Sequence, residues 1–482
     1  MKTARSAFLM TSLALALVFL AGEARALPAF ARKYQTSCLT CHDVFPKRNI
    51  TGEAFRLNGF RFVDDETYVK EPPVELGDEA YKRLWPNAVW PSDTPRTSPF
   101  SVLVKSMLEV ELDDDRDNSV NFLFPEGMEI VAAGTMGDDI SIYSDIIFEQ
   151  SDYGGQAVEN WVSMKAWIEF QDLLGPENMF NLRWGTVGTH TLGLFTARAE
   201  NTFSTHPPLY MSWIMPTVDE NANNLLAFEG NNFTISWPRL GFELSGFGKR
   251  WFYDIGYVAG NITDEQAEPG GGEIFFTGSG KNEPYKDTFL SLAWKIGGIG
   301  FDGDAGSETP GTLTTRTEFW RDDSLTLALF GYQGTGAIKS QDLSTLQWWE
   351  GEDKFWRFGA GFEQKYRDLT VGGHYMLGKN EDPYGNLSDE SVESTTWHLE
   401  TSYWIYPWLM PYVKYQFLEL NLPQDVIYDL GQDQDQSFLL VGCRYLMRPN
   451  VTFATEYSKY FRGESFREGL DEVLFVMLHY AM

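Results

Sequence analysis

Two cysteines and a histidine stand within five residues of one another, at Cys38, Cys41 and His42. This Cys-x-x-Cys-His spacing is that of covalent haem attachment, in which two thiols bond the haem vinyl groups and the histidine reaches the iron. A redox dithiol would need a βαβ context and a zinc site would need two further ligands, and the sequence offers neither. We therefore expect one haem c, held by Cys38 and Cys41, with His42 as the proximal ligand.

The second axial position of the iron has no obvious occupant. Between Asp43 and Ser106 the chain holds neither methionine nor histidine, the usual distal ligands. The distal ligand is therefore unknown, and water or the amine of Leu27 would serve as well as a distant side chain. One long loop supplies the side-chain candidates, which are His190, His206, Met211 and Met215. The strand-like runs hold the histidines that we expect to be structural, which are His374, His398 and His479.

Residues 1–26 have the three parts of a secretory signal: a basic start, an apolar run from Ala7 to Ala21 and a small-residue exit at Ala24 to Ala26. The apolar run is about fifteen residues, whereas a helix that spans a bilayer needs roughly twenty. We expect cleavage before Leu27. Because bacterial c-type haem is attached outside the cytoplasm, the signal and the haem motif support each other.

Charge and cysteine content exclude several classes of protein. The formal net charge of −30 would repel phosphate backbones, so we expect no nucleic-acid partner. Three cysteines cannot build a disulfide framework. The third, Cys443, lies in an apolar run, where a small filler of a strand is the expected role.

Glycine and proline residues divide the mature chain into two parts. A short helix is predicted from Ile50 to Phe60, stopped by Gly59, and prolines then recur from Pro72 to Pro99. We place a boundary near residue 96. Residues 27–95 then form the haem segment with its linker, and residues 96–482 form a second domain.

The second domain alternates apolar and polar residues with a period of two. Each such run is expected to be a strand with one apolar face. The clearest runs are Asp139–Glu149, Val162–Phe170, Val451–Tyr457 and, at the C-terminus, Leu474–Met482. Outer-membrane barrels usually end on Phe or Trp, and Met482 departs from that pattern.

Short turns recur between the runs, at Leu174–Pro176, Arg321–Asp323, Tyr366–Asp368, Tyr406–Trp408 and Met447–Asn450. The last four lie about forty to forty-six residues apart, which fits hairpins with one tight turn and one long loop. This asymmetry favours an outer-membrane barrel, mainly β, of about sixteen strands over a soluble sandwich. Several aromatic residues at strand ends are expected in interfacial girdles: Trp320, Trp356, Trp404, Trp408 and Tyr412.

The stretch from Gly188 to Gly241 is too long for an ordinary turn. It either folds into the lumen or forms an external loop. Basic residues that could face inward are Lys165, Arg183, Lys414 and Arg444, and each could instead pair with a carboxylate. Acidic loop residues that could concentrate ferrous iron are Asp113, Asp114, Asp115, Asp433 and Asp435, although solvated carboxylates need no such role.

The N-terminal segment resembles the outer-membrane monohaem cytochrome-porin fusions of iron-oxidising bacteria. The resemblance is carried by Pro28–Arg32, Cys38, Cys41, His42, Phe45–Pro46 and Gly52–Phe60. It implies a haem segment within or against a porin of about sixteen strands, lying in the outer membrane with the N-terminus periplasmic or in the lumen. It also implies electron flow from extracellular Fe(II) through the haem to a periplasmic c-type cytochrome or similar carrier. Similar chains in metal-reducing bacteria leave the direction of flow open.

Three functions are therefore expected alternatives. The first is electron transfer across the outer membrane, with the chain acting as an iron:cytochrome c oxidoreductase or, in reverse, exporting electrons to metal. The second is a diffusive porin whose haem segment serves as a plug or sensor. The third is a haem enzyme such as a peroxidase, for which the sequence places no distal histidine-arginine pair near the iron.

Overall fold

The computed structural model describes most of the chain beyond residue 28. The described residues are 29–34, 36–44, 47–62, 100–112, 120–136, 139–151, 159–188, 209, 228–229, 231, 233, 235, 239–260, 274–276, 285–304, 318–342, 347–385, 390–423, 435–448, 450–462 and 472–481. Structural statements below concern these residues.

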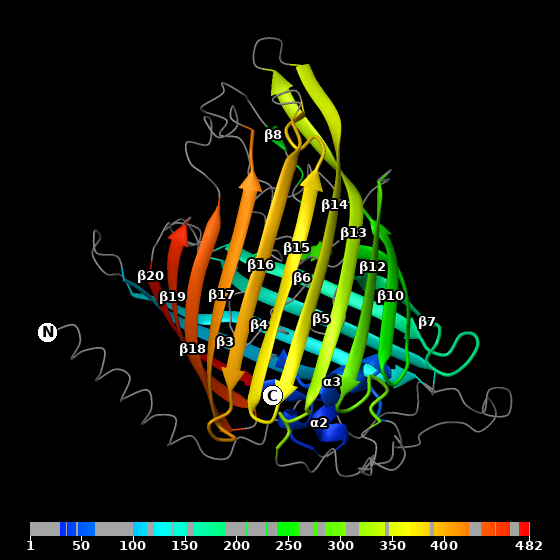
Figure 1. Ribbon diagram of the computed structural model, residues 1–482, viewed down its shortest axis with the longest axis vertical. Helices are drawn as coiled ribbons and strands as arrows, with labels where there is room; N and C mark the ends of the chain where they lie inside the picture. The colour runs from blue at the N-terminus through cyan, green and yellow to red at the C-terminus, as the bar shows by residue number, and fades with distance from the viewer. Residues whose placement is uncertain are drawn as a thin grey trace, which may run out of the picture.

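Sixteen of the described strands form a closed antiparallel ring (Figure 1). They are β3 (Phe100–Glu111), β4 (Val120–Met136), β5 (Ile140–Ser151), β6 (Glu159–Phe170), β7 (Asn181–Val187), β9 (Arg239–Phe247), β10 (Trp251–Ala259), β12 (Lys286–Gly297), β13 (Ser324–Asp342), β14 (Gln347–Tyr366), β15 (Leu369–Asn380), β16 (Val392–Tyr403), β17 (Leu409–Asn421), β18 (Gln436–Arg448), β19 (Val451–Arg462) and β20 (Glu472–Ala481). The last strand, β20, pairs with β3 and closes the ring.

Each strand points apolar side chains outward and a mixed set inward. In β12, for example, Leu292 and Trp294 are 44% and 53% exposed, while Ala293 between them and Ser291 and Lys295 on either side are buried. An apolar outer surface of this size is unfavourable in water and favourable in lipid. Lipid cannot form hydrogen bonds with the backbone at an open sheet edge, so the sheet must close. The closed ring with its apolar outer face is therefore an integral outer-membrane barrel, as the alternating pattern predicted.

The two ends of the barrel differ, which confirms the predicted asymmetry. Tight connections join β9 to β10, β14 to β15, β16 to β17 and β18 to β19 at one end, whereas long segments join β7 to β9 and β10 to β12 at the other. Residues 298–323, between β12 and β13, are a long exception at the tight end. Short turns face the periplasm in such barrels, so the tight end is periplasmic.

The N-terminal segment lies at this periplasmic end (Figure 1). Its elements are α2 (Ala29–Lys33), a 3-10 turn η1 (Cys38–Thr40), the hairpin of β1 (His42–Val44) with β2 (Lys47–Arg48), and α3 (Ile50–Leu57). The helix predicted from Ile50 is confirmed, and Gly59 adopts a φ of +62° just beyond its end. No described helix is long and apolar enough to cross a membrane.

Part of the girdle prediction is wrong. Trp356 and Trp408 do face outward, at 41% exposure each, but Trp320, Trp404 and Tyr412 are buried within the protein. There they join an apolar cluster that includes Met410 and Leu440. Position near a strand end does not fix the side of the sheet, because one residue of register reverses the face.

The long stretch between β7 and β9 enters the lumen where it is described. Leu209 is buried and its backbone N–H donates to the Gln416 side chain of β17 at 2.8 Å. Phe233 packs on Phe355 of β14, with ring centroids 4.3 Å apart. The short strand β8 (Phe228–Glu229) pairs with β13, and β11 (Ile274–Phe276) runs parallel to β6. The lumen-facing alternative is therefore confirmed for Leu209 and Phe233.

Candidate functional site

The Cys-x-x-Cys-His motif forms one tight turn followed by a short strand. Ser37 caps the 3-10 turn by accepting a hydrogen bond from the Leu39 N–H at 3.2 Å. The Cys41 N–H donates to the Cys38 carbonyl at 3.2 Å, which closes the turn. Both cysteines thus flank a single turn, and His42 follows directly in β1.

Both cysteines of the motif are free, and Cys38 is buried while Cys41 is half-buried. Burial raises the pKa of Cys38 to about 11 and that of Cys41 to about 12. At neutral pH both are therefore protonated thiols rather than thiolates. A raised pKa of this kind disfavours a free, reactive thiolate at either position.

Asn49 fixes the motif from outside it. As the N-cap of α3 it accepts from the Gly52 N–H at 2.9 Å, and its side-chain amide donates to the carbonyls of Leu39 at 3.2 Å and Thr40 at 3.1 Å. Its own N–H donates to the Cys41 carbonyl at 3.0 Å. One residue therefore ties the attachment turn to the start of the helix. Sequence reasoning missed Asn49, although an Asn directly before a predicted helix is a capping signal.

Gly52 allows α3 to approach the motif closely. A Cβ added at this position would lie 2.0 Å from the Cys41 carbonyl oxygen and 2.9 Å from its carbon, both backbone atoms. Only glycine fits such a contact. The glycine thus sets the distance between α3 and the attachment turn.

An aromatic cluster lies beside the cysteines, made of Phe30, Tyr34, Phe55, Phe60 and Phe62. Cys41 packs against it, and so do Tyr143 of β5 and Trp167 of β6. Within it Phe30 and Phe60 stack at 5.0 Å, and Phe60 stacks on Trp167 at 5.6 Å. Two free thiols, an adjacent imidazole and an apolar aromatic surface are the donor set and surroundings that a covalent haem requires, so the residues fit that group.

The segment is bound to the barrel wall on several sides. The Ala29 N–H donates to Ser101 of β3 at 2.5 Å, and Gln171 donates to the Leu57 carbonyl at 3.2 Å. The Asn58 amide reaches the carbonyl of Asp302 at 3.3 Å. These contacts come from well-separated parts of the ring, so the segment sits in the periplasmic mouth.

One buried and one half-buried ion pair join the segment to β14. Lys365 Nζ lies 3.0 Å from Asp43 Oδ2, and Lys47 Nζ lies 3.0 Å from Glu363 Oε2. Asp43 and Lys365 are both nearly inaccessible to solvent. Asp43 directly follows His42, so the Asp43–Lys365 ion pair holds the end of the haem motif against the wall.

Replacing Lys365 by Met should release the segment. Breaking a buried pair leaves an uncompensated charge, here Asp43, at a cost of about 3–5 kcal/mol. The denaturant midpoint at which protease cleaves the segment in folded barrels measures this. Lys379→Met is the matched control, since its pair with Glu393 is solvent-exposed at 3.7 Å and should contribute under about 1 kcal/mol. Equal midpoints in the two variants would show that the Lys365–Asp43 ion pair does not stabilise the docked segment.

A second charged group stabilises the segment internally. Glu53 accepts from Arg48 at 2.6 Å and from Arg56 at 3.2 Å. Burial alone would raise the pKa of Glu53, but the two guanidinium groups outweigh it and lower the pKa below the usual 4.5. The carboxylate is therefore held in its charged form.

Acid should weaken the segment through Glu53. Because its pKa is lower in the folded than in the unfolded state, its contribution is complete above about pH 4.5 and is lost as the pH falls through the lowered value. We expect protease resistance of the segment to decline over that acidic range. Glu53→Gln should be less stable at neutral pH and should lose this part of the pH dependence. A parallel acid profile in the variant would contradict the assignment.

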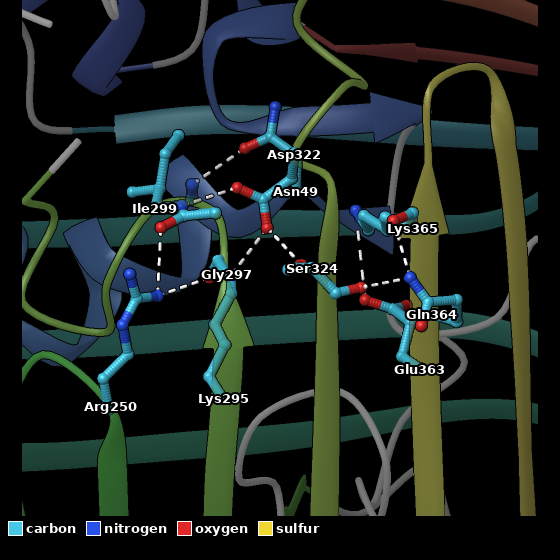
Figure 2. Close-up of polar contacts among 12 residues, drawn as sticks. Asn49, Arg250, Lys295, Gly297, Ile299, Asp322, Ser324, Glu363, Gln364 and Lys365 are labelled. Carbon is cyan, nitrogen blue, oxygen red and sulfur yellow. Dashed lines mark hydrogen bonds and ion pairs between the residues drawn. The ribbon is translucent and has the colours of Figure 1, made fainter. Parts of the chain in front are cut away.

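A small cavity of about 30 Å³ separates the segment from β12 and β14. Its lining includes Asn49 and Glu53 from the segment and Lys295, Asp322 and Glu363 from the barrel side. Figure 2 shows Asn49 near this wall, where Lys295 Nζ lies 2.7 Å from Asp322 and the Ile299 N–H donates to the same carboxylate at 2.7 Å. Asp322 is thus paired within the wall itself, and the cavity between wall and segment has room for a water molecule.

The structure places Cys38, Cys41 and His42 in one turn and the start of the strand that follows it, and none of the predicted distal ligands is among the described residues. The proposed loop ligands His190, His206, Met211 and Met215 lie outside the described residues, as does Leu27. All three strand histidines, His374, His398 and His479, belong to the inner-facing sets of β15, β16 and β20. Within the described chain no three His, Cys, Asp or Glu side chains are already grouped to hold a metal ion.

Arg183 and Lys414, two of the four basic residues predicted to face inward, have carboxylate neighbours, and Lys165 lies opposite Asp145 in the strand register. Arg183 lies between Glu169 at 2.8 Å and Glu243 at 2.9 Å. Arg444 and Lys414 are also buried on the inner side, and Lys414 is directly opposite Glu400 in the strand register. Of the acidic loop residues, Asp435 accepts from the Leu420 N–H at 2.9 Å, and the other four lie outside the described residues.

No protein-family model matches the chain, and no curated protein matches it. Among solved structures, it is similar to a loop-deletion mutant of OmpT, an outer-membrane protein of Vibrio cholerae (13% identity, TM-score 0.45, covering 80% of this chain and 98% of that one). It is similar to an anion-selective porin from Comamonas acidovorans (10% identity, TM-score 0.47, covering 80% of this chain and 98% of that one). It is also similar to the outer-membrane channel DcaP of Acinetobacter baumannii (10% identity, TM-score 0.43, covering 80% of this chain and 96% of that one). The identity to all three is low. The chain is a barrel because its own strands close into a ring.

Proposed function

We propose that this protein transfers electrons across the outer membrane through one c-type haem attached to Cys38 and Cys41, with His42 as an iron ligand. Extracellular Fe(II) is the donor and a periplasmic c-type cytochrome or similar carrier is the acceptor. The observation that carries the proposal is the position of the attachment turn, which the buried pair Lys365–Asp43 and the half-buried pair Lys47–Glu363 hold inside the barrel mouth.

The chain's own residues prepare the site. When bound, the haem supplies a one-electron iron couple. Asn49 and Gly52 hold the two thiols and His42 in one orientation relative to α3. The rings around Phe60 exclude water from one side of the motif, and a less polar surrounding shifts a redox potential. The barrel provides a passage through lipid that a free cytochrome would lack.

Proteoliposomes test the proposal directly. With Fe(II) added outside and a cytochrome c enclosed, wild-type protein should reduce the enclosed carrier, and its own haem band should appear in the reduced spectrum first. A variant with Cys38 and Cys41 both replaced by Ala should leave the carrier oxidised. Carrier reduction at equal rates by both proteins would refute the proposal.

A diffusive porin is the second candidate, favoured by the closed sixteen-strand ring itself. Planar-bilayer conductance distinguishes it. The electron-transfer protein should conduct little, because the segment occupies one mouth and residues such as Leu209 and Phe233 pack within the lumen. Large, steady conductance in wild type, with no haem reduction by Fe(II), would favour the porin. Arg183 is flanked by two carboxylates, so we expect it to add little anion selectivity in that case.

A further inference from the structure

Two imidazoles face each other on the inner wall of the barrel. His374 of β15 and His398 of β16 are directly opposite in the strand register. Their ring centroids are 4.0 Å apart, at an interplanar angle of 71°. Both point into the lumen, since the next residues, Tyr375 and Leu399, are 48% and 44% exposed on the lipid side. Opposed side chains in an antiparallel pair are close enough to share one ligand.

The pair lies just beyond the contact between the N-terminal segment and the wall. Glu363, which binds Lys47, is opposite Gly372, and His374 is the next inward residue of β15 away from the tight turn. The pair is thus one side-chain row farther into the lumen. Lys47 is also near enough to His398 for the two to interact electrostatically. An ion moving inward from the outer end would meet the imidazoles before it met the haem segment.

Two carboxylates border the same part of the wall. Gly372 stands between Glu363 on one side and Glu400 on the other in the register. A Cβ added at Gly372 would meet only the Phe362 carbonyl oxygen, at an ordinary 3.6 Å. No other described atom lies within 4 Å of that position, so the space in front of Gly372 is open.

The formal charges of four groups near the pair, Lys47, Glu363, Lys414 and Glu400, sum to zero. Lys47 neutralises Glu363 and Lys414 stands opposite Glu400 in the register. A divalent cation held by two neutral imidazoles would therefore face no net positive charge from these four groups. Imidazole nitrogen is a ligand that first-row transition metals prefer over magnesium or calcium.

We propose that His374 and His398 together bind one divalent first-row transition-metal ion in the lumen, Fe(II) among them. The two imidazoles supply the protein ligands and water completes the coordination, with Glu363 and Glu400 positioned to accept hydrogen bonds from that water. That Fe(II) uses this site on its way to oxidation rests on the proposed function. In that role the ion loses one electron to the ferric haem and leaves as Fe(III).

Cobalt(II) titration of the purified, detergent-solubilised barrel tests the site without needing haem turnover. Its visible d–d bands report nitrogen ligation, and excess Mg²⁺ suppresses binding by surface carboxylates. Wild type should bind one Co(II) with a nitrogen-ligated spectrum. His374→Gln and His398→Gln should each weaken that binding by at least about tenfold. His479→Gln is the matched control, an inward and buried histidine on β20 that should leave affinity unchanged.

Glutamine keeps a polar side chain of similar size, and heat-modifiable gel mobility verifies that each variant forms the barrel. Wild-type affinity in both folded variants would overturn the metal site. Normal Co(II) binding by wild type, lost in the variants, would uphold it even if Fe(II) never reduced the haem. That combination would instead refute the proposed function. Unchanged haem reduction by Fe(II) in His374→Gln and His398→Gln would overturn the role in iron oxidation alone.

Discussion

Replacing Cys38 and Cys41 together by Ala is expected to abolish covalent haem while leaving the barrel intact. The two thiols supply both thioether bonds, so without them His42 would retain at most one coordinate bond to the iron. Neither cysteine belongs to a strand of the ring, since both lie in the turn before β1. The measurement is haem staining after denaturing electrophoresis, with pyridine haemochrome to count haem per chain in a host that matures cytochromes.

Cys443→Ala is the matched control for this experiment. Cys443 lies on β18 within the barrel wall, between Gly442 and Arg444, and its removal should leave the haem count unchanged. Single replacement of Cys38 or Cys41 should leave one thioether and an intermediate yield. Haem that stays covalently bound in the double variant would rule out the attachment site.

The barrel was predictable because its signal is repeated. A period of two specifies a face of a strand, and in Val451–Tyr457 the predicted alternation reappears as outward Val451 and Phe453 beside inward Thr452 and Ala454. Lipid requires closure of the sheet, so strand length and loop spacing then fixed the approximate strand number. These constraints act on every hairpin, and one misread strand does not change the outcome.

The contacts of the haem segment were not predictable in the same way. Asp43 and Lys365 are far apart in the chain and nothing local marks either as a partner of the other. The same limit applies to Trp404 and Tyr412, which were expected at the membrane interface but pack inward. Such pairings depend on which strands face one another across the lumen, and a single sequence does not record this.

The pairing of His374 with His398 depends on the register between two strands and not on the sequence of either strand alone. His374 and His398 each looked structural within their own strand, and only the antiparallel alignment of β15 with β16 places them opposite each other. A strand slip of one residue would turn one imidazole to the lipid side and remove the pair. The chemistry proposed for these residues therefore depends on pairing and not on either residue's local pattern.

Gly52→Ala is expected to disrupt the attachment turn although it adds a single methyl group. The new Cβ would lie 2.0 Å from the Cys41 carbonyl oxygen, a backbone atom that cannot rotate away. Helix α3 must then move off the turn, at a cost of about 1–3 kcal/mol for overpacking. The bonds from Asn49 to the Cys41, Leu39 and Thr40 carbonyls would lengthen or break, at about 1 kcal/mol each. We expect a loss of several kcal/mol of segment stability.

The readouts are haem per chain and the protease resistance of the segment, both relative to wild type. Gly134→Ala serves as the control, because a Cβ added at that position of β4 meets no atom within 4 Å. It should match wild type in both measurements, whereas Gly52→Ala should lose most of its haem or release the segment to protease. If Gly52→Ala instead kept full haem and full resistance, the close approach of α3 to Cys41 would not be what positions the motif.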